Sequence, residues 1–161
     1  MRKNMYNPND QFSRTDLAVK LTCRLMECGF TRDKAFERGP EKIREHVYVR
    51  EIKSNIYVVV YTSCSGHRGI ISARNCGRDA IRVIALYRSS EGTKRGLSKH
   101  RRVNRTGTVD NIVDRTVQRA RDAWRVGANP ESCKDCGAPM FTSKKNNRVC
   151  AEACWTRSKR G

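Results

Sequence analysis

The stretch VDNIVDRTVQRARDAWRVG, residues 109–127, has the periodicity of an amphipathic helix and decides how the rest of the chain can pack. Its apolar residues recur three or four positions apart and form one stripe, which comprises Val109, Ile112, Val113, Val117, Ala120 and Trp124. Thr108 precedes the stripe and can cap the helix, and Gly127 stands where the helix is expected to stop. A one-sided stripe needs an apolar surface to cover, so we expect this helix to lie on a sheet.

Three segments that precede this helix have the pattern of β-strands. Residues 46–52 have a period of two, and a turn at Ser54-Asn55 leads to residues 56–62, which are apolar on both faces. Residues 79–88 form the third strand, and residues 70–71 could add a short fourth one. Together these segments predict one antiparallel sheet of three to four strands.

A second helix is predicted in SRTDLAVKLTCRLMECGF, residues 13–30. Ser13 or Thr15 can cap it, Gly29 is placed for a C-terminal cap, and the apolar positions recur at helical spacing: Leu17, Leu21, Leu25 and Cys28. The fold class we expect is therefore α+β, with an antiparallel sheet packed by two helices. The expected division is an arm at 1–12, a basic domain at 13–127 and a cysteine-rich module at 128–161.

The composition is strongly basic, with 34 lysine and arginine residues against 16 acids and a formal charge of +18. Such a field favours a polyanion as partner, and nucleic acid above all. No segment has the roughly 18 unbroken apolar residues of a spanning helix, so no membrane partner is expected. The polar first residues lack the apolar run of a secretory signal, so we expect a cytoplasmic location with reduced cysteines.

The basic residues are densest between positions 94 and 105, where no acid intervenes. Residues 89–107 have few apolar side chains, which predicts a loop that runs into the helix N-terminus at residues 108–110. The free N–H groups of that terminus also favour phosphate. We therefore expect phosphate contacts from Lys94, Arg95, Lys99, Arg101, Arg102 and Arg105.

The segment CKDCGAPMFTSKKNNRVCAEACW, residues 133–155, contains two close cysteine pairs separated by thirteen residues. Tetrahedral Zn²⁺ needs two short knuckles of this kind, each supplying two sulfurs. A module this small has almost no apolar core, so metal binding would supply much of its folding free energy. The expected zinc ligands are Cys133, Cys136, Cys150 and Cys154. A redox dithiol or a disulfide pair is the alternative.

CKDCGAPM resembles the start of the C-terminal C4 zinc ribbons of bacterial type IA topoisomerases, with matches at Cys133, Cys136, Gly137, Pro139 and Met140. Lys134 stands where the ribbon usually has proline, and RVCAEAC departs from the usual second half. Those ribbons bind mainly single-stranded DNA, so the resemblance implies base stacking and phosphate contacts, by position from Phe141, Trp155, Lys144, Lys145 and Arg148. Packing of the two aromatic side chains against the protein is the alternative.

The main domain has a weaker likeness in element order alone, to double-stranded-RNA-binding domains and to Rad52-type annealing proteins. The function we expect is non-catalytic binding of nucleic acid, with single-stranded DNA favoured over RNA. Strand annealing, with assembly into rings or filaments, is one form of it. A structural or translation-associated RNA-binding protein is the runner-up.

Two further hypotheses rest on other residue groups. A metal-dependent nuclease could use Glu51 and Lys53 on a strand with Asp79, although the aspartate usually precedes such a pair. A second metal site, or a Cys/His nucleophile pair, could be drawn from Cys23, Cys28, Cys64, His67 and Cys76.

Overall fold

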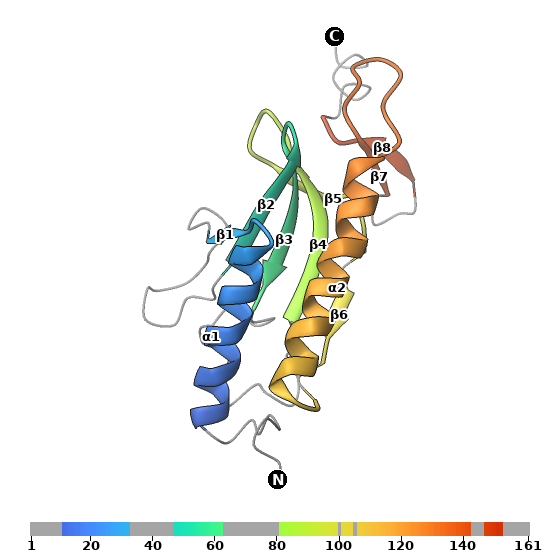
Figure 1. Cartoon of the computed structure of the whole chain (residues 1–161). Coiled ribbons are helices and arrows are strands. Elements are labelled where there is room, and N and C mark those ends of the chain that lie inside the picture. Colours follow the sequence, from blue (N-terminus) through green and yellow to red (C-terminus); the bar gives the residue numbers. More distant parts are fainter. Residues whose placement is uncertain are drawn as a thin grey trace.

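In the computed structural model of the chain, the structure describes residues 11–32, 47–62, 81–99, 101–104, 106–142 and 147–152. These residues form a six-stranded antiparallel sheet with two helices on one side, followed by a small two-stranded sheet (Figure 1). The expected α+β class is confirmed. Residues 1–10 of the arm predicted at 1–12, and the strand predicted at 70–71, lie outside the described residues, and residues 11–12 belong to the first helix.

The three long strands are those that the periodicity predicts: β2 (Val47–Lys53), β3 (Ile56–Tyr61) and β4 (Ile81–Arg88). Three short strands complete the sheet: β1 (Thr31–Arg32), β5 (Lys94–Gly96) and β6 (Arg101–Val103). The order is β1-β2-β3-β4-β5, and β6 also pairs with β4. The continuous apolar run of β3 is explained by its central position, because Val58, Val59 and Val60 are buried on both faces of the sheet.

Helix α1 (Gln11–Glu27) ends at a left-handed glycine, as its sequence predicts. Gly29 has φ +88°, its N–H bonds to the Met26 carbonyl, and the Phe30 N–H bonds to the Leu25 carbonyl. This is a Schellman motif, and the burial of Phe30 and Leu25 supplies its usual apolar contact. The predicted N-terminal cap is wrong, because the helix begins at Gln11, ahead of Ser13 and Thr15.

Helix α2 (Val109–Ala128) is capped by Thr108, whose side chain accepts a hydrogen bond from the Asn111 N–H at 3.1 Å. The predicted stripe faces the core: its members are buried except Trp124, which is half-buried. The prediction that the helix stops at Gly127 is wrong. This glycine lies inside α2 and is buried, so its role is steric rather than conformational.

The main core lies between the two helices and the sheet, and joins α1 leucines to residues of β2, β3, β4 and α2. Tyr48 of β2 is buried in it, and its hydroxyl lies 2.6 Å from the Thr22 hydroxyl of α1, so its polar end is hydrogen-bonded. Across the two helices Lys20 pairs with Asp110 at 3.4 Å, and Arg24 pairs with Asp114 at 3.2 Å.

The opposite face of the sheet carries a second apolar cluster of Val47, Val49, Val59, Ile84 and Leu86. The half-buried rings of Tyr57 and Tyr61 pack against it. Within the described ranges, both helices lie on the other side of the sheet (Figure 1). These five residues are 0–5% exposed, so this side of the sheet is covered as well. We call the side that carries this second cluster the second face.

The basic segment after β4 is not the loop that its polarity predicts. It returns along β4 as two short strands, β5 and β6. After β5 the Leu97 N–H bonds to the Ala85 carbonyl at 2.8 Å, and the Ala85 N–H bonds to Ser98 Oγ at 3.1 Å. Leu97 packs against the core and Val103 is buried in it, so these two side chains add apolar contacts to the backbone pairing with β4.

Candidate metal centre and basic sheet edge

The two-stranded sheet of the C-terminal module, β7 (Met140–Thr142) and β8 (Arg148–Cys150), stands next to a tight turn that carries the first cysteine pair. In this turn the Cys133 N–H bonds to the Ala138 carbonyl at 2.7 Å, and the Gly137 N–H bonds to the Cys133 carbonyl at 2.9 Å. Gly137 has φ +78°, a conformation that favours glycine. The glycine of the CxxCG pattern is therefore explained by the turn geometry.

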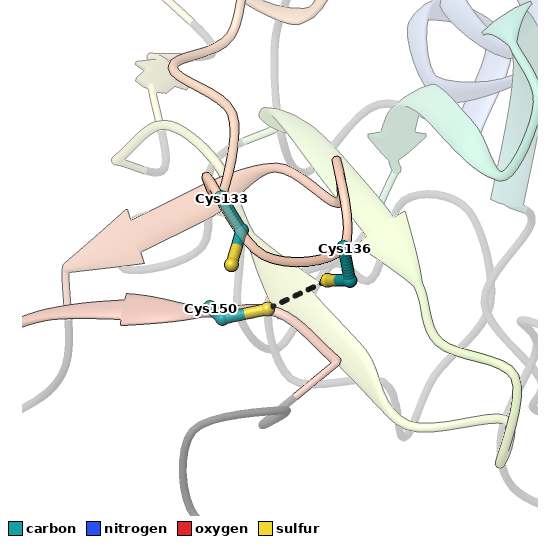
Figure 2. A group of neighbouring side chains, drawn as sticks. All are labelled: Cys133, Cys136 and Cys150. Atoms are coloured by element: carbon teal, nitrogen blue, oxygen red, sulfur yellow. Dashed lines mark hydrogen bonds between the residues drawn. The ribbon is translucent and has the colours of Figure 1, made fainter. Parts of the chain in front are cut away.

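Three cysteine side chains converge between the turn and β8 (Figure 2). The Sγ atoms of Cys133, Cys136 and Cys150 all lie within 4.8 Å of one another, and those of Cys136 and Cys150 are 3.5 Å apart. Tetrahedral zinc with Zn–S bonds of about 2.3 Å needs sulfurs about 3.8 Å apart, whereas a disulfide needs about 2.05 Å. The cluster can therefore hold a metal such as zinc. Cys154, the predicted fourth ligand, lies outside the described residues.

The module packs against the end of the main sheet. Ala138, Cys150 and Ala151 form a buried cluster with Ile56 and Tyr87 of the sheet. Cys150 is only 5% exposed, so one of the three thiols is shielded by the main domain as well as by its own module. The three-cysteine cluster thus lies at the junction of the two sheets.

Polar contacts at this junction converge on the Glu152 carboxylate. Tyr87 Oη donates to Glu152 Oε1 at 2.6 Å, the Ser90 N–H donates to the same oxygen at 2.8 Å, and Ser90 Oγ donates to Glu152 Oε2 at 2.8 Å. Burial, and then the hydrogen bond and negative charge of Glu152, raise the pKa of Tyr87 to about 12. Glu152 therefore fixes the residues after β8 to the turn between β4 and β5.

The predicted phosphate-binding residues are distributed along the edge of the sheet. Lys94 and Arg95 lie in β5, Arg101 and Arg102 lie in β6, and Lys99 lies between the two strands. All are exposed except Lys94, which is half-buried. Arg105 lies outside the described residues.

Strand register divides this basic edge between the two sides of the sheet. Arg102 stands opposite Arg82, and Lys94 stands opposite Arg88, so each β4 arginine faces another cation on the second face. Sequence reasoning missed Arg82 and Arg88. The period of two in IRVIALYR places both of them on one face and could have found them.

On the helix side of the sheet, Arg95 lies near the ribbon. Its guanidinium is 5.3 Å from the ring centroid of Phe141, which is half-buried in the junction cluster. Arg148 is also engaged within the module, with the Glu131 carboxylate at 2.6 Å and the Thr142 hydroxyl at 3.1 Å. These contacts favour the packing interpretation of Phe141, and the nucleic-acid roles of both residues stay predictions. Lys144, Lys145 and Trp155 lie outside the described residues.

The predicted phosphate site at the start of α2 contains a carboxylate that would repel phosphate, and the cations near it already contact protein groups. Asp110 places a carboxylate in the first turn, and Lys20 of α1 pairs with it. Arg115 is directed to the segment before the helix, where it donates to the carbonyls of Asn104 and Thr106. This arginine fixes the chain between β6 and α2.

The residues of the two remaining hypotheses are only partly described. Glu51 and Lys53 are exposed on β2, on either side of an irregularity in its pairing with β3, and Asp79 lies outside the described residues. Cys23 and Cys28 lie on α1 and just after it. The other three members of the second metal hypothesis, Cys64, His67 and Cys76, lie outside the described part.

Among the residues that the structure describes, the three-cysteine cluster is the one group of metal-ligating side chains that comes together. Neither described helix combines the length and the apolar character that crossing a bilayer requires. In comparisons with known proteins, no family model matches this chain, and no curated protein or solved structure is significantly similar to it.

Proposed function

We propose that this chain is a non-catalytic nucleic-acid-binding protein that holds single-stranded DNA along its basic sheet edge, with a zinc-bound ribbon as a second module. The observation that carries the proposal is the facing of like charges at that edge, Arg82 with Arg102 and Arg88 with Lys94. Like charges directly opposite each other on neighbouring strands destabilise a sheet. An anionic ligand between them would offset that cost.

A polyphosphate fits this edge better than a single small anion does. The two cation pairs are separated by six positions on β4, from Arg82 to Arg88, which corresponds to about 20 Å along a strand. The formal charge of +18 adds a long-range attraction to any extended polyanion. A nucleic-acid backbone can engage both pairs together, whereas a single small anion reaches only one.

The ribbon supports the same function by its position. Its junction with the main domain includes Tyr87 of β4 and Ser90 of the turn that leads into β5. When bound, zinc would supply folding free energy to the module, and its cysteine ligands would hold β8 against the turn. Two linked contact surfaces would raise the affinity through effective concentration. The resemblance of CKDCGAPM to topoisomerase ribbons favours single-stranded DNA over RNA.

A competition experiment tests the proposal. A labelled 20-nucleotide oligo(dT) is bound to the protein, and unlabelled single-stranded DNA, duplex DNA and structured RNA are added as competitors, with fluorescence anisotropy as the readout. We expect single-stranded DNA to compete best. Preference for structured RNA would favour the translation-associated alternative, and failure to bind any oligonucleotide in dilute buffer would refute the proposal.

The same preparation separates binding from cleavage. The protein is incubated with the labelled oligonucleotide and Mg²⁺, and the products are resolved on a denaturing gel. We expect no new ends. Cleavage that requires Mg²⁺ and disappears in Glu51→Gln would establish the nuclease alternative instead.

A further inference from the structure

The outward side of helix α1 carries a ridge of uncharged side chains. Val19 is 56% exposed and Met26 is 54% exposed, and Cys23 between them is also exposed. These positions are four and three residues apart, so they lie in one line along the helix. We call Val19, Cys23 and Met26 the α1 ridge. The side of a helix that faces solvent is normally polar or charged, so an uncharged ridge there indicates a surface for contact.

A groove runs along each side of the α1 ridge. The groove toward α2 has a volume of about 470 Å³, and Lys20 and Val113 are among the residues that line it. The groove on the other side has a volume of about 380 Å³, and its lining includes Thr22 and Tyr48. Two helices pack with the side-chain ridge of one in a groove of the other. The outer surface of α1 therefore has the shape that a second helix requires.

The charged side chains on the α2 side of the ridge carry no excess of positive charge. Lys20 pairs with Asp110 at 3.4 Å and with Asp16 at 3.6 Å. Arg24 pairs with Asp114 at 3.2 Å. Three acids therefore balance two cations here, although the whole chain has a formal charge of +18. A polyanion is not favoured at this surface, whereas a protein surface with the same mixture of charges fits it.

The order of residues along α1 makes the ridge complementary to a second copy of itself. Val19 and Lys20 precede Cys23 by four and three positions, and Met26 and Glu27 follow it by three and four. Antiparallel copies with Cys23 at a two-fold axis place Val19 beside Met26 of the second copy. They also place Lys20 beside Glu27 of the second copy, because these two residues are seven positions apart and share one side of the helix. Each apolar residue thus meets an apolar residue, and each cation meets an acid.

We propose that this chain forms a dimer in which the α1 ridges of two copies pack antiparallel, with Cys23 of each copy next to the two-fold axis. The dimer goes beyond the proposed function and does not depend on it, because the nucleic-acid contacts are assigned to the sheet edge at β5 and β6. A single helix face is small for a protein interface, so association is expected at about 10 to 500 μM protein.

Sedimentation velocity over a concentration series tests the dimer. The measurements are made in about 0.3 M salt, which screens the long-range repulsion between two basic chains. Met26→Lys places a charge in the apolar contact of both copies, and it should raise the protein concentration at half-dimerisation about tenfold or more. Val126→Lys is the matched control, because Val126 is 45% exposed on α2 and lies outside the ridge. We expect less than about a twofold change in the control.

A charge swap tests the antiparallel arrangement. Glu27→Lys places two lysines side by side at each end of the interface, and it should weaken association about 3- to 10-fold. The double variant Lys20→Glu/Glu27→Lys restores opposite charges between the copies and should dimerise within about twofold of wild type. The swap does not restore the pairs that Lys20 makes with Asp16 and Asp110 in its own chain. Rescue of the dimer is therefore distinct from an effect on stability, which thermal melting measures.

Cys23 provides a covalent test. A short bis-maleimide reagent links two exposed thiols that lie close together, so a covalent dimer is expected from the wild type at concentrations where it associates. Cys28→Ser, which changes a half-buried cysteine after α1, should keep this product, and Cys23→Ser should lose it.

The outcomes separate the dimer from the proposed function. A wild type that stays monomeric up to about 1 mM overturns the dimer and leaves the proposed function standing. Equal effects of Met26→Lys and Val126→Lys, a charge swap that does not restore association, or a covalent dimer that persists in Cys23→Ser also overturns it. A protein that dimerises as described but binds no oligonucleotide refutes the proposed function alone.

Discussion

At the scale of single residues, the structure assigns to several side chains a role that their residue type alone does not predict. Gly127 is the clearest case, because glycine near the end of a helical pattern normally marks the C-terminus. Here it allows α2 to approach the sheet. A Cβ at this position would lie 2.4 Å from Ile52 Cδ1 and 3.3 Å from Ile56 Cγ2.

We expect Gly127→Ala to destabilise the protein by about 1 kcal/mol. Overpacking costs about 1–3 kcal/mol, and the better helix propensity of alanine returns up to about 1 kcal/mol. The closest clash is with a terminal methyl group, so Ile52→Val, which removes that methyl, should relieve it. Urea denaturation of the wild type, the two single variants and the double variant gives the coupling energy. Additive effects would contradict the steric explanation.

The pKa of Tyr87, raised to about 12 by burial and by Glu152, predicts the pH dependence of the junction. An unfolded tyrosine ionises near pH 10. The phenol is protonated in both states below pH 10, so its contribution to stability is fully present there. It is lost as the pH rises from about 10 through about 12, because the unfolded chain releases the proton more readily.

Absorbance of tyrosinate at 295 nm measures this ionisation, and the difference between wild type and Tyr87→Phe isolates the one group. We expect a midpoint near pH 12 and a lower midpoint in Glu152→Gln. A wild-type midpoint near pH 10 would show that the contact between the hydroxyl and Glu152 is absent in solution.

At the scale of elements, long periodic segments were predictable and short ones were not. The stripe of α2 and the three long strands follow from their own residues, because each buries enough apolar surface to define its face. β5 and β6 escaped prediction because their side chains are mostly basic and only their backbone pairs with β4. A short edge strand of this kind depends on its neighbour rather than on its own pattern.

The cysteine cluster was more predictable from the sequence than the contacts around it. The spacing of the cysteines identified Cys133, Cys136 and Cys150, which the structure brings together. The docking of the module on Ile56 and Tyr87 was not predictable, since neither side chain differs in the sequence from an ordinary core residue. The sequence also does not show whether an aromatic ring packs inside the protein or faces a ligand. Phe141 was therefore a candidate for stacking on bases, whereas in the structure it is half-buried beside Arg95.

Removal of the metal should unfold the C-terminal module and leave the main domain folded. We expect Cys136→Ser to lose bound zinc, measured by mass spectrometry of the metal, and to lose protection of amide protons in β7 and β8. Core amides of β3 and β4 should stay protected, because their main cluster contains no residue of the module. Cys23→Ser, which changes an exposed cysteine of α1, is the control and should keep its metal. One equivalent of zinc retained by Cys136→Ser would contradict the assignment.

At the scale of the whole molecule, charge is the dominant property, and strand register concentrates part of it at one edge. We expect the affinity for oligo(dT) to fall steeply with salt. Four phosphate contacts, one for each cation of the two facing pairs, give a slope of about −2.8, or about a 50-fold loss between 50 and 200 mM salt. Anisotropy titrations at several salt concentrations measure the slope. Affinity independent of salt would show that the binding is not made through phosphates.

The two ends of the strand order have a consequence for the behaviour of the protein in concentrated solution. At one edge β1 has only two residues, and at the other the outer strands β5 and β6 have three residues each and carry several positive charges. An exposed strand that is long, flat and neutral recruits another chain into the same sheet, and short, kinked or charged edges prevent this. The features that would attract a nucleic acid therefore also discourage the sheet from growing by strand addition into amyloid-like aggregates.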